Sequence, residues 1–341
     1  MKNVLRFILF ASIGFAVLYY IFYTQQRDYE ANCVQEQCSF WAKILEDFSK
    51  VNFMWVGVTV ICYLCSNICR SLRWQILAEP LGVLKHSSSS LASVFISYLV
   101  NLTIPRSGEI ARASALAKYE NISFERSVGT IVIERVVDML TFLLIAILTI
   151  ILAYKDIFEY ISNNLNLNDK FNKISNLSFS LLILAAGFIV LFVIYKKYRE
   201  QILKSKIGAK ILSIITGIGE GLKSVLNLKR PGLFFIYSIL IWVMYFLMAY
   251  FMFKAFPPVA HLSYKVALVV LFFGTLGFIF PMPAGMGSYH FFAMQSLGLY
   301  GINGSDAFTY ANLNFFTIQI FCNIFFGTIA FIWLAYNKPK V

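Results

Sequence analysis

Long apolar runs constrain this chain more than any other feature. A helix needs about 20 apolar residues to cross the hydrocarbon core of a bilayer, with a usable range of about 17 to 25. Six such runs predict six transmembrane helices, at residues 7–23, 53–69, 131–154, 177–195, 233–253 and 311–335. Composition agrees, because 59% of the 341 residues are apolar and only 13% are charged, unlike soluble domains. The sequence predicts an all-α, polytopic integral membrane protein with one membrane-embedded domain over residues 1–341.

The first apolar run and the cysteines raise two side questions. A polar segment, 24–27, follows the first run where a signal peptide would have a small-residue cleavage site, so we interpret the run as a retained anchor. Four of the six cysteines lie in apolar runs and are interpreted as small apolar residues, so no metal and no cofactor is predicted. Cys33 and Cys38 lie in the loop 24–50, and the sequence leaves a disulfide between them open.

Two apolar stretches are too short to cross a membrane comfortably. Residues 91–104 end in a Pro-Arg-Ser-Gly-Glu segment, and residues 266–280 end in a segment rich in proline and glycine. Irregular backbone at membrane depth is tolerated only where protein or a water-filled cavity covers it. Both stretches are therefore predicted to be re-entrant helical hairpins.

The distribution of basic residues predicts the orientation. With a cytoplasmic N-terminus and two hairpins that return to their starting side, the inside segments carry 20 Lys and Arg and the outside loops carry 8. Cytoplasmic loops are enriched in these residues, so both termini are predicted to lie in the cytoplasm, at a bacterial inner membrane. The same bias accounts for the net charge of +12 without nucleic acid as a partner.

The basic segment 196–232 joins two predicted spans on the cytoplasmic side. Isoleucine, leucine and valine recur at helical spacing in its central part, with lysines elsewhere on the helical wheel. We interpret this segment as an amphipathic connector at the membrane surface.

The two short stretches occupy matching places in the chain. Residues 53–154 contain a span, a broken stretch and a second span, and residues 233–335 contain the same series in the opposite orientation. Paired segments interrupted by proline or glycine are the best sequence indication of a transporter's substrate site. The pattern predicts an inverted repeat, which is visible in the topology and not in sequence identity.

The first broken stretch carries six candidate substrate-binding residues: Asn101, Pro105, Arg106, Gly108, Glu109 and Arg112. Arginine suits bidentate phosphate binding, and Glu109 is expected to pair with Arg106 or Arg112. Two earlier arginines, Arg70 and Arg73, close the preceding span, and we interpret them as ordinary signals of cytoplasmic orientation.

Three charged residues stand near the start of the span 131–154. Glu134 and Asp138 lie one helical turn apart, and Arg135 is expected to reach Asp138. Acidic residues are also favoured near a helix N-terminus by its dipole, which gives a purely structural alternative. Because a charge at mid-membrane costs about 2.5–3.5 kcal/mol, we expect a protein-lined site that faces the first hairpin, with proton coupling as a weaker addition.

The second broken stretch carries five further candidates: Pro281, Pro283, Gly285, Gly287 and His290. Proline and glycine bring backbone amides close to a ligand there. A histidine at a membrane interface is more often simply hydrogen-bonded, so a substrate or proton role for His290 is the minor alternative.

These residues resemble the transmembrane region of lysylphosphatidylglycerol synthases, a family with flippase-like activity. The resemblance rests on four segments, 70–74, 101–112, 127–138 and 281–287, in that order along the chain. It implies a bacterial or archaeal membrane protein that has two re-entrant elements and translocates lipid. Full synthases continue into an aminoacyl-transfer domain, so this chain is not expected to make the lysyl lipid itself. Many relatives also have an Arg-Glu pair where this chain has Ser288-Tyr289-His290, which puts the same headgroup in question.

The function predicted is translocation of an anionic or headgroup-modified lipid. No enzyme signature is present. Two alternatives stay open: an integral-membrane transferase that uses Glu109 or Asp138 as a base, and a non-transporting partner that recruits a lipid- or glycan-synthesis enzyme through the basic segment 196–232.

Overall fold

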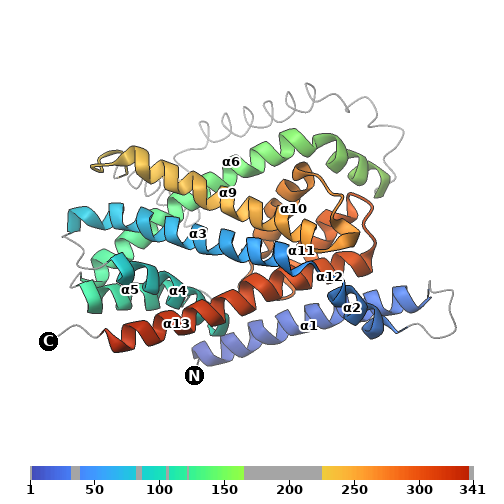
Figure 1. Ribbon diagram of the computed structural model, residues 1–341, viewed down its shortest axis with the longest axis horizontal. Helices are drawn as coiled ribbons and strands as arrows, with labels where there is room; N and C mark the ends of the chain where they lie inside the picture. The colour runs from blue at the N-terminus through green and yellow to red at the C-terminus, as the bar shows by residue number, and fades with distance from the viewer. Residues whose placement is uncertain are drawn as a thin grey trace, which may run out of the picture.

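The computed structural model describes residues 2–31, 39–81, 87–104, 107–120, 123–164 and 225–337. Every regular element in these ranges is helical. The first half contains α1 (Lys2–Ala31), α2 (Phe40–Ser49), α3 (Phe53–Ala78), α4 (Ser87–Thr103), α5 (Gly108–Glu120) and α6 (Phe124–Asn164). The second half contains α9 (Pro231–Ala255), α10 (Tyr264–Gly277), α11 (Ser288–Gly298), α12 (Gly304–Phe315) and α13 (Asn323–Tyr336), as Figure 1 shows.

Four helices in the described residues are long and apolar enough to cross a membrane. They cover Phe53–Ala78, Phe124–Asp156, Pro231–Ala255 and Gly304–Tyr336, which confirms helices at four of the six predicted spans. The run 7–23 lies within the 30-residue helix α1. The run 177–195, residues 196–224 of the basic segment, and Cys33 and Cys38 lie outside the described residues.

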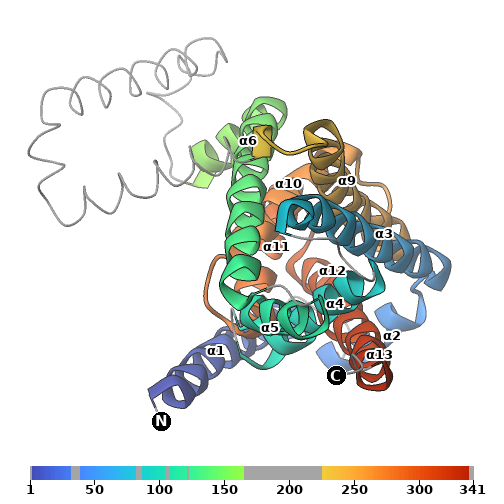
Figure 2. The same cartoon turned by 90° about the vertical axis from the view of Figure 1, so that its left-hand side faces the viewer.

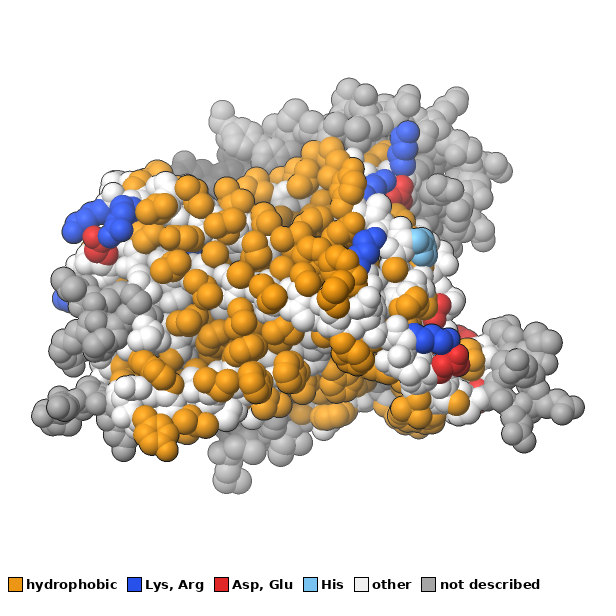
Figure 3. Space-filling model, viewed as in Figure 1, with side chains coloured by type: hydrophobic (Ala, Val, Ile, Leu, Met, Phe, Trp, Pro, Cys, Tyr) orange, Lys and Arg blue, Asp and Glu red, His pale blue; other side chains and the backbone are white. Residues whose placement is uncertain are grey.

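The outer surface matches a protein that contacts lipid. Large apolar side chains such as Leu144, Ile147 and Phe331 are more than half exposed. In Figure 3 apolar side chains cover the middle of the visible face, and the charged ones gather toward its two ends. Burying apolar surface against lipid is favourable, so the chain is a polytopic membrane protein.

Local sequence accounts for where several helices begin. The side chain of Asn52 accepts a hydrogen bond from Met54 N–H before α3, and the side chain of Asn303 accepts one from Asp306 N–H before α12. Pro231 occupies the first position of α9, where its missing N–H costs nothing. These caps satisfy backbone donors that the helix leaves unpaired.

A π-helical segment, Phe316–Cys322, joins α12 to α13. Such segments are rare and are frequent at functional sites. The segment widens the backbone within the last long helix and contributes Ile318 and Gln319 to the cavity described below.

The order of elements repeats. A long helix, a short pair and a second long helix occur as α3, α4–α5 and α6, and again as α9, α10–α11 and α12–α13. The short helices of each pair pack on one another, and in Figure 1 the two pairs lie in opposite halves of the molecule. Figure 2, viewed from the end of the molecule that carries the C-terminus, shows α3, α6, α9, α10 and the α4–α5 pair arranged around the centre.

Each short pair is held together by a close approach at a glycine. A Cβ atom on Gly108 would lie 2.2 Å from the carbonyl oxygen of Ser97, and one on Gly277 would lie 2.7 Å from Cα of Tyr289. Neither position has room for a larger residue. The two glycines therefore set how closely α5 approaches α4 and α11 approaches α10.

Helix α2 is attached to the start of α12 by a small charged cluster. Lys43 Nζ donates to Asp306 Oδ1 at 2.7 Å and also to Asp47, whose second partner is the Thr309 hydroxyl. Burial lowers the pKa of Lys43, but its hydrogen bonds to Asp306 and Asp47 outweigh this effect and hold the pKa above its usual value. The cluster fixes the loop helix α2 beside the last long helix.

Candidate functional site

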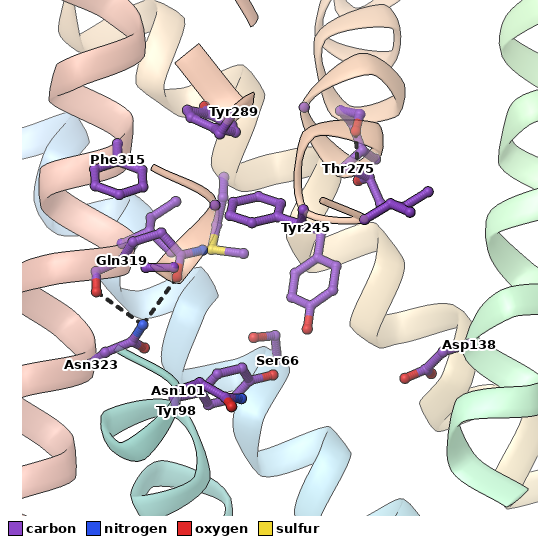
Figure 4. A pocket seen from close by; sticks show the side chains of 18 of the residues that line it. Ser66, Tyr98, Asn101, Asp138, Tyr245, Thr275, Tyr289, Phe315, Gln319 and Asn323 are labelled. Atoms are coloured by element: carbon purple, nitrogen blue, oxygen red, sulfur yellow. Dashed lines mark hydrogen bonds between the residues drawn. The ribbon is translucent and has the colours of Figure 1, made fainter. Parts of the chain in front are cut away.

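A cavity of about 920 Å³ lies between the two repeated units. Its walls come from α3, α6, α9, α10 and the α12–α13 helix, and both short pairs reach it. The first pair contributes Asn101 of α4 and Glu109 of α5 to the lining. The turn of the second pair contributes residues 278–282, with Ala284 and Gly285. Figure 4 shows part of this lining, with side chains from several helices directed into one space.

A buried cluster of three arginines and two carboxylates stands behind one wall of the cavity. Arg73 of α3 contacts Asp138 Oδ1 at 2.7 Å and Glu134 Oε1 at 3.1 Å, both on α6. Its side chain has no exposed surface. We call the five residues Arg70, Arg73, Arg112, Glu134 and Asp138 the arginine cluster.

The outer arginines complete the cluster from two directions. Arg70 Nη1 lies 3.0 Å from Asp138 Oδ2, and Arg112 Nη1 of α5 lies 2.6 Å from Glu134 Oε2. Aromatic rings cover the same groups, with Arg112 over Trp74 and Arg73 over Phe234, each 5.7 Å from the ring centroid. The cluster therefore links α3, α5 and α6 through charge and packing together.

The arginine cluster carries more positive than negative charge. Three guanidinium groups face two carboxylates, which leaves one positive charge in excess. Arg70 brings this charge to the cavity wall, where its Nη2 donates to the Tyr245 hydroxyl at 2.9 Å. An uncompensated charge at low dielectric attracts an anion strongly.

A second ion pair, Glu109–Arg135, also reaches the cavity. Arg135 Nη2 lies 2.7 Å from Glu109 Oε1, and the two side chains are 52% and 30% exposed. This pair is electrically neutral and far more open than the arginine cluster. It joins α5 to α6 without changing the charge of the cavity.

The other side of the cavity is polar and uncharged in the described residues. The Tyr63 hydroxyl donates to Asn323 Oδ1 at 2.7 Å, and Asn323 Nδ2 donates to Gln319 Oε1 at 3.1 Å. Asn314 donates to the Tyr289 hydroxyl. Figure 4 shows Gln319 and Asn323 on one side and Asp138 on the other, with Tyr245 between them.

The structure separates the predicted site residues into three groups. Six line the cavity: Asn101, Glu109, Arg135, Asp138, Pro281 and Gly285. Six others lie outside its lining: Gly108, Arg112, Glu134, Pro283, Gly287 and His290. Pro105 and Arg106 lie outside the described residues.

Several residues outside the lining have evident structural contacts. Gly108 sits at the α4–α5 crossing, where its N–H donates to Asn101 Oδ1. Gly287 packs on α1, because a Cβ atom there would lie 2.6 Å from the carbonyl oxygen of Gly14. His290 is buried, and its Nδ1 accepts the N–H of Gly287 at 3.4 Å.

One interpretation and two predicted pairings differ from the structure. Arg70 and Arg73 are not simple orientation signals, since both are buried in the arginine cluster. Of the two partners expected for Glu109, Arg112 pairs with Glu134 instead, and Glu109 pairs with Arg135; the other, Arg106, lies outside the described residues. Arg135 consequently does not pair with Asp138, because Arg70 and Arg73 hold that carboxylate from the neighbouring helix.

Sequence reasoning also missed the uncharged polar wall. Asn314, Gln319 and Asn323 fall within the apolar run 311–335, and Asn67 lies in the run that forms α3. Polar side chains inside a transmembrane segment usually face a protein interior or a water-filled cavity. Amides within apolar runs were the signal that could have found this wall.

Comparison with known proteins identifies the family. No curated protein and no solved structure matches the chain. The family model described as the lysylphosphatidylglycerol synthase TM region matches residues 39–325. This range includes both short pairs and the whole arginine cluster, and the match confirms the resemblance found in the motifs. The chain belongs to the lysylphosphatidylglycerol synthase transmembrane-region family.

Proposed function

We propose that the central cavity carries the headgroup of an anionic lipid across the membrane while the acyl chains stay in the bilayer. Membership of the family indicates a membrane function related to lipids. The observation that carries the proposal is the excess positive charge of the arginine cluster, which Arg70 brings to the wall of a cavity of about 920 Å³. This volume falls within the range of about 300–1,000 Å³ that is typical of small-molecule sites.

Two re-entrant hairpins, α4–α5 and α10–α11, form part of this proposal. Helix α4 has 17 residues and α10 has 14, which gives lengths of about 26 Å and 21 Å at about 1.5 Å per residue. The hydrocarbon core is about 30 Å thick. Each pair would enter from one side and return to it, within six spans related as an inverted repeat.

The same proposal includes orientation and location. The bias of lysine and arginine supports cytoplasmic termini and a bacterial inner membrane. In this arrangement α4–α5 enters from the cytoplasmic side and α10–α11 from the outside. A headgroup could then pass from one hairpin tip to the other through the shared cavity.

The contacts of the cavity carboxylates favour a translocase over a transferase. A transferase needs a free base, and the two carboxylates in the described lining each face at least one arginine: Glu109 faces Arg135, and Asp138 faces Arg70 and Arg73. In both cases an arginine occupies a carboxylate oxygen that a general base would have to offer to the substrate. The recruitment alternative depends on segment 196–232, most of which lies outside the described residues, and stays a prediction.

Redistribution of fluorescent lipids in proteoliposomes tests the proposal. Purified protein would be compared with Arg70→Gln and with Arg126→Gln, which removes an exposed arginine at the start of α6. We expect anionic lipid to move in the wild type and in Arg126→Gln, and to slow about tenfold in Arg70→Gln. Size-exclusion profiles and melting curves would show whether each variant is folded. Equal rates in protein-free vesicles and wild type, or in folded Arg70→Gln and wild type, would overturn the proposal.

A further inference from the structure

The uncharged wall of the cavity indicates which chemical groups of the headgroup, other than the phosphate, it can bind. Of the five carboxamides that line the cavity, four belong to long helices: Asn67, Asn314, Gln319 and Asn323. We call these four residues the amide wall. A carboxamide offers both donors and acceptors in one group, so it matches hydroxyl groups, which also donate and accept.

The amide wall is held in place by its own hydrogen bonds. Asn323 is fixed between the Tyr63 hydroxyl and Gln319, and Asn67 Nδ2 donates to the Tyr63 carbonyl at 2.8 Å. Fixing the amides before a ligand arrives lowers the entropy cost of binding. The wall is therefore a preorganised hydrogen-bonding surface.

Each of the charged lining residues Arg70, Glu109 and Asp138 has one buried polar atom without a hydrogen-bond partner in the described part of the chain. Two further such atoms belong to uncharged side chains of the lining. They are Oδ1 of Asn314, an acceptor, and Nε1 of Trp242, a donor, and both atoms are buried. A buried polar group without a partner costs about 1–3 kcal/mol. One free acceptor and one free donor suit a headgroup with several hydroxyls.

Charge argues against a cationic headgroup. An ammonium group needs a carboxylate, and the two carboxylates in the described lining, Glu109 and Asp138, already pair with arginines that would compete with it. Arg70 stands at the same cavity and would repel a cation. A headgroup that places its phosphate beside Arg70 and its uncharged hydroxyls at the amide wall matches the chemistry of both walls.

We propose that the transported lipid is an anionic phosphodiester whose headgroup is a neutral polyol, such as glycerol, inositol or a sugar. This inference rests on the proposed translocation and adds the chemistry of the headgroup. The arginine cluster would select the phosphate, and the amide wall would select the hydroxyls. A lipid that carries an amine would be disfavoured at both walls, because Arg70 repels an ammonium group and the amide wall has no carboxylate to pair with it.

A lipid panel in proteoliposomes tests the selection. Fluorescent phosphatidylglycerol and phosphatidylinositol would be compared with phosphatidylserine, phosphatidic acid and lysylphosphatidylglycerol. We expect the two polyol lipids to move about tenfold faster than the other three. If no lipid moves, the proposed translocation itself fails. If all anionic lipids move equally, or an amine-bearing lipid moves fastest, the polyol assignment is overturned while translocation stands.

Variants assign the selection to the amide wall. Gln319→Leu keeps the size of the side chain and removes its hydrogen bonds, and Gln26→Leu makes the same change on α1, away from the cavity. We expect Gln319→Leu to slow phosphatidylglycerol about fivefold or more and to leave phosphatidic acid unchanged. Equal slowing of both lipids, or no slowing of either, would contradict a role for Gln319 in recognising hydroxyl groups.

A binding measurement separates a lipid from a soluble phosphate. The melting temperature of the detergent-purified protein would be measured with short-chain phosphatidylglycerol and with glycerol 3-phosphate, since a ligand of the folded state raises it. We expect stabilisation by the short-chain lipid alone, reduced in Gln319→Leu. Equal stabilisation by glycerol 3-phosphate would overturn the lipid assignment.

Discussion

The two short helix pairs have the same place in their units, but they are built from different interactions. In the first pair, α5 supplies Arg112 to the arginine cluster and Glu109 to a second ion pair. In the second pair, α10 and α11 pack through Gly277 against Tyr289, and Tyr289 stacks on Phe278 with ring centroids 5.2 Å apart. The described residues of α11 include no acidic or basic side chain apart from His290.

This difference shows that one architecture can use two means of holding a broken helix in a membrane. Close packing at a glycine is common to both pairs, at Gly108 and at Gly277. In the first pair buried charge is added, since each buried carboxylate needs its arginine from a neighbouring helix. The cavity also has one charged and one uncharged wall, and the amides of the uncharged wall belong to long helices rather than to the second pair. The predictions below test the difference between the two pairs and between the two walls.

The largest expected effect is the loss of a carboxylate from the first unit. Glu134→Gln would leave Arg112 without its partner and Arg73 with Asp138 alone. Breaking a buried ion pair costs about 3–5 kcal/mol, so we expect a large fall in melting temperature or failure to purify as a folded protein. Thermal unfolding in detergent measures it.

Glu109→Gln is the matched control for this loss. It breaks an ion pair between the same two helices, α5 and α6, but the pair is partly exposed and is expected to contribute about 0–1 kcal/mol. If the two variants melt at the same temperature, burial does not explain how the first pair is held.

The next effect concerns the hydrogen bond that joins the two units at the cavity. Tyr245 of α9 accepts from Arg70 of α3, and a hydrogen bond to a charged group contributes about 1.5–3 kcal/mol. We expect Tyr245→Phe to lower stability by about that amount and to slow anionic lipid movement. Tyr264→Phe, at an exposed position, should change neither, and a similar loss in both variants would argue against this contact.

A third, comparable or smaller effect tests the packing of the second pair. Gly277→Ala would place a Cβ atom 2.7 Å from Cα of Tyr289, and overpacking typically costs about 1–3 kcal/mol. Gly57→Ala is the control, because nothing lies within 4 Å of a Cβ atom there. We expect thermal unfolding to show a loss only for Gly277→Ala. An unchanged Gly277→Ala would mean that close packing does not set the α10–α11 crossing.

The smallest effect is pH dependence at the Lys43 cluster, which supports α12 beside the second pair. Because the pKa of Lys43 is raised in the folded protein, its contribution to stability is complete below the usual lysine pKa and is lost as pH rises through the folded value. Melting curves from pH 8 to strongly alkaline pH should show a loss that Lys43→Met lacks. An identical pH profile in both proteins would contradict this assignment.

The sequence was sufficient for the membrane class and for the positions of the broken helices. Apolar runs identified α3, α6, α9 and the α12–α13 helix because lipid contact demands long apolar segments. Prolines and glycines located both short pairs. The family resemblance was also readable, since its segments are local in the chain.

The partners of the charged residues were not readable from the sequence. Arg70 and Arg73 have the composition of an orientation signal, and only the register of α3 against α6 places them beside Asp138 and Glu134. Helical spacing predicts contacts within one helix, such as Arg135 with Asp138. It cannot show that a neighbouring helix supplies the arginines instead, so pairings across helices required the folded structure.

The central claim, that the excess positive charge of the arginine cluster selects anionic lipid, has one direct test. Arg112→Gln makes the cluster neutral while Glu134 keeps Arg73 and Asp138 keeps both of its arginines. Arg112→Lys keeps the charge. In proteoliposomes we expect anionic lipid movement to fall about tenfold in Arg112→Gln and to be largely retained in Arg112→Lys. Equal rates in wild type and a folded Arg112→Gln would contradict the claim.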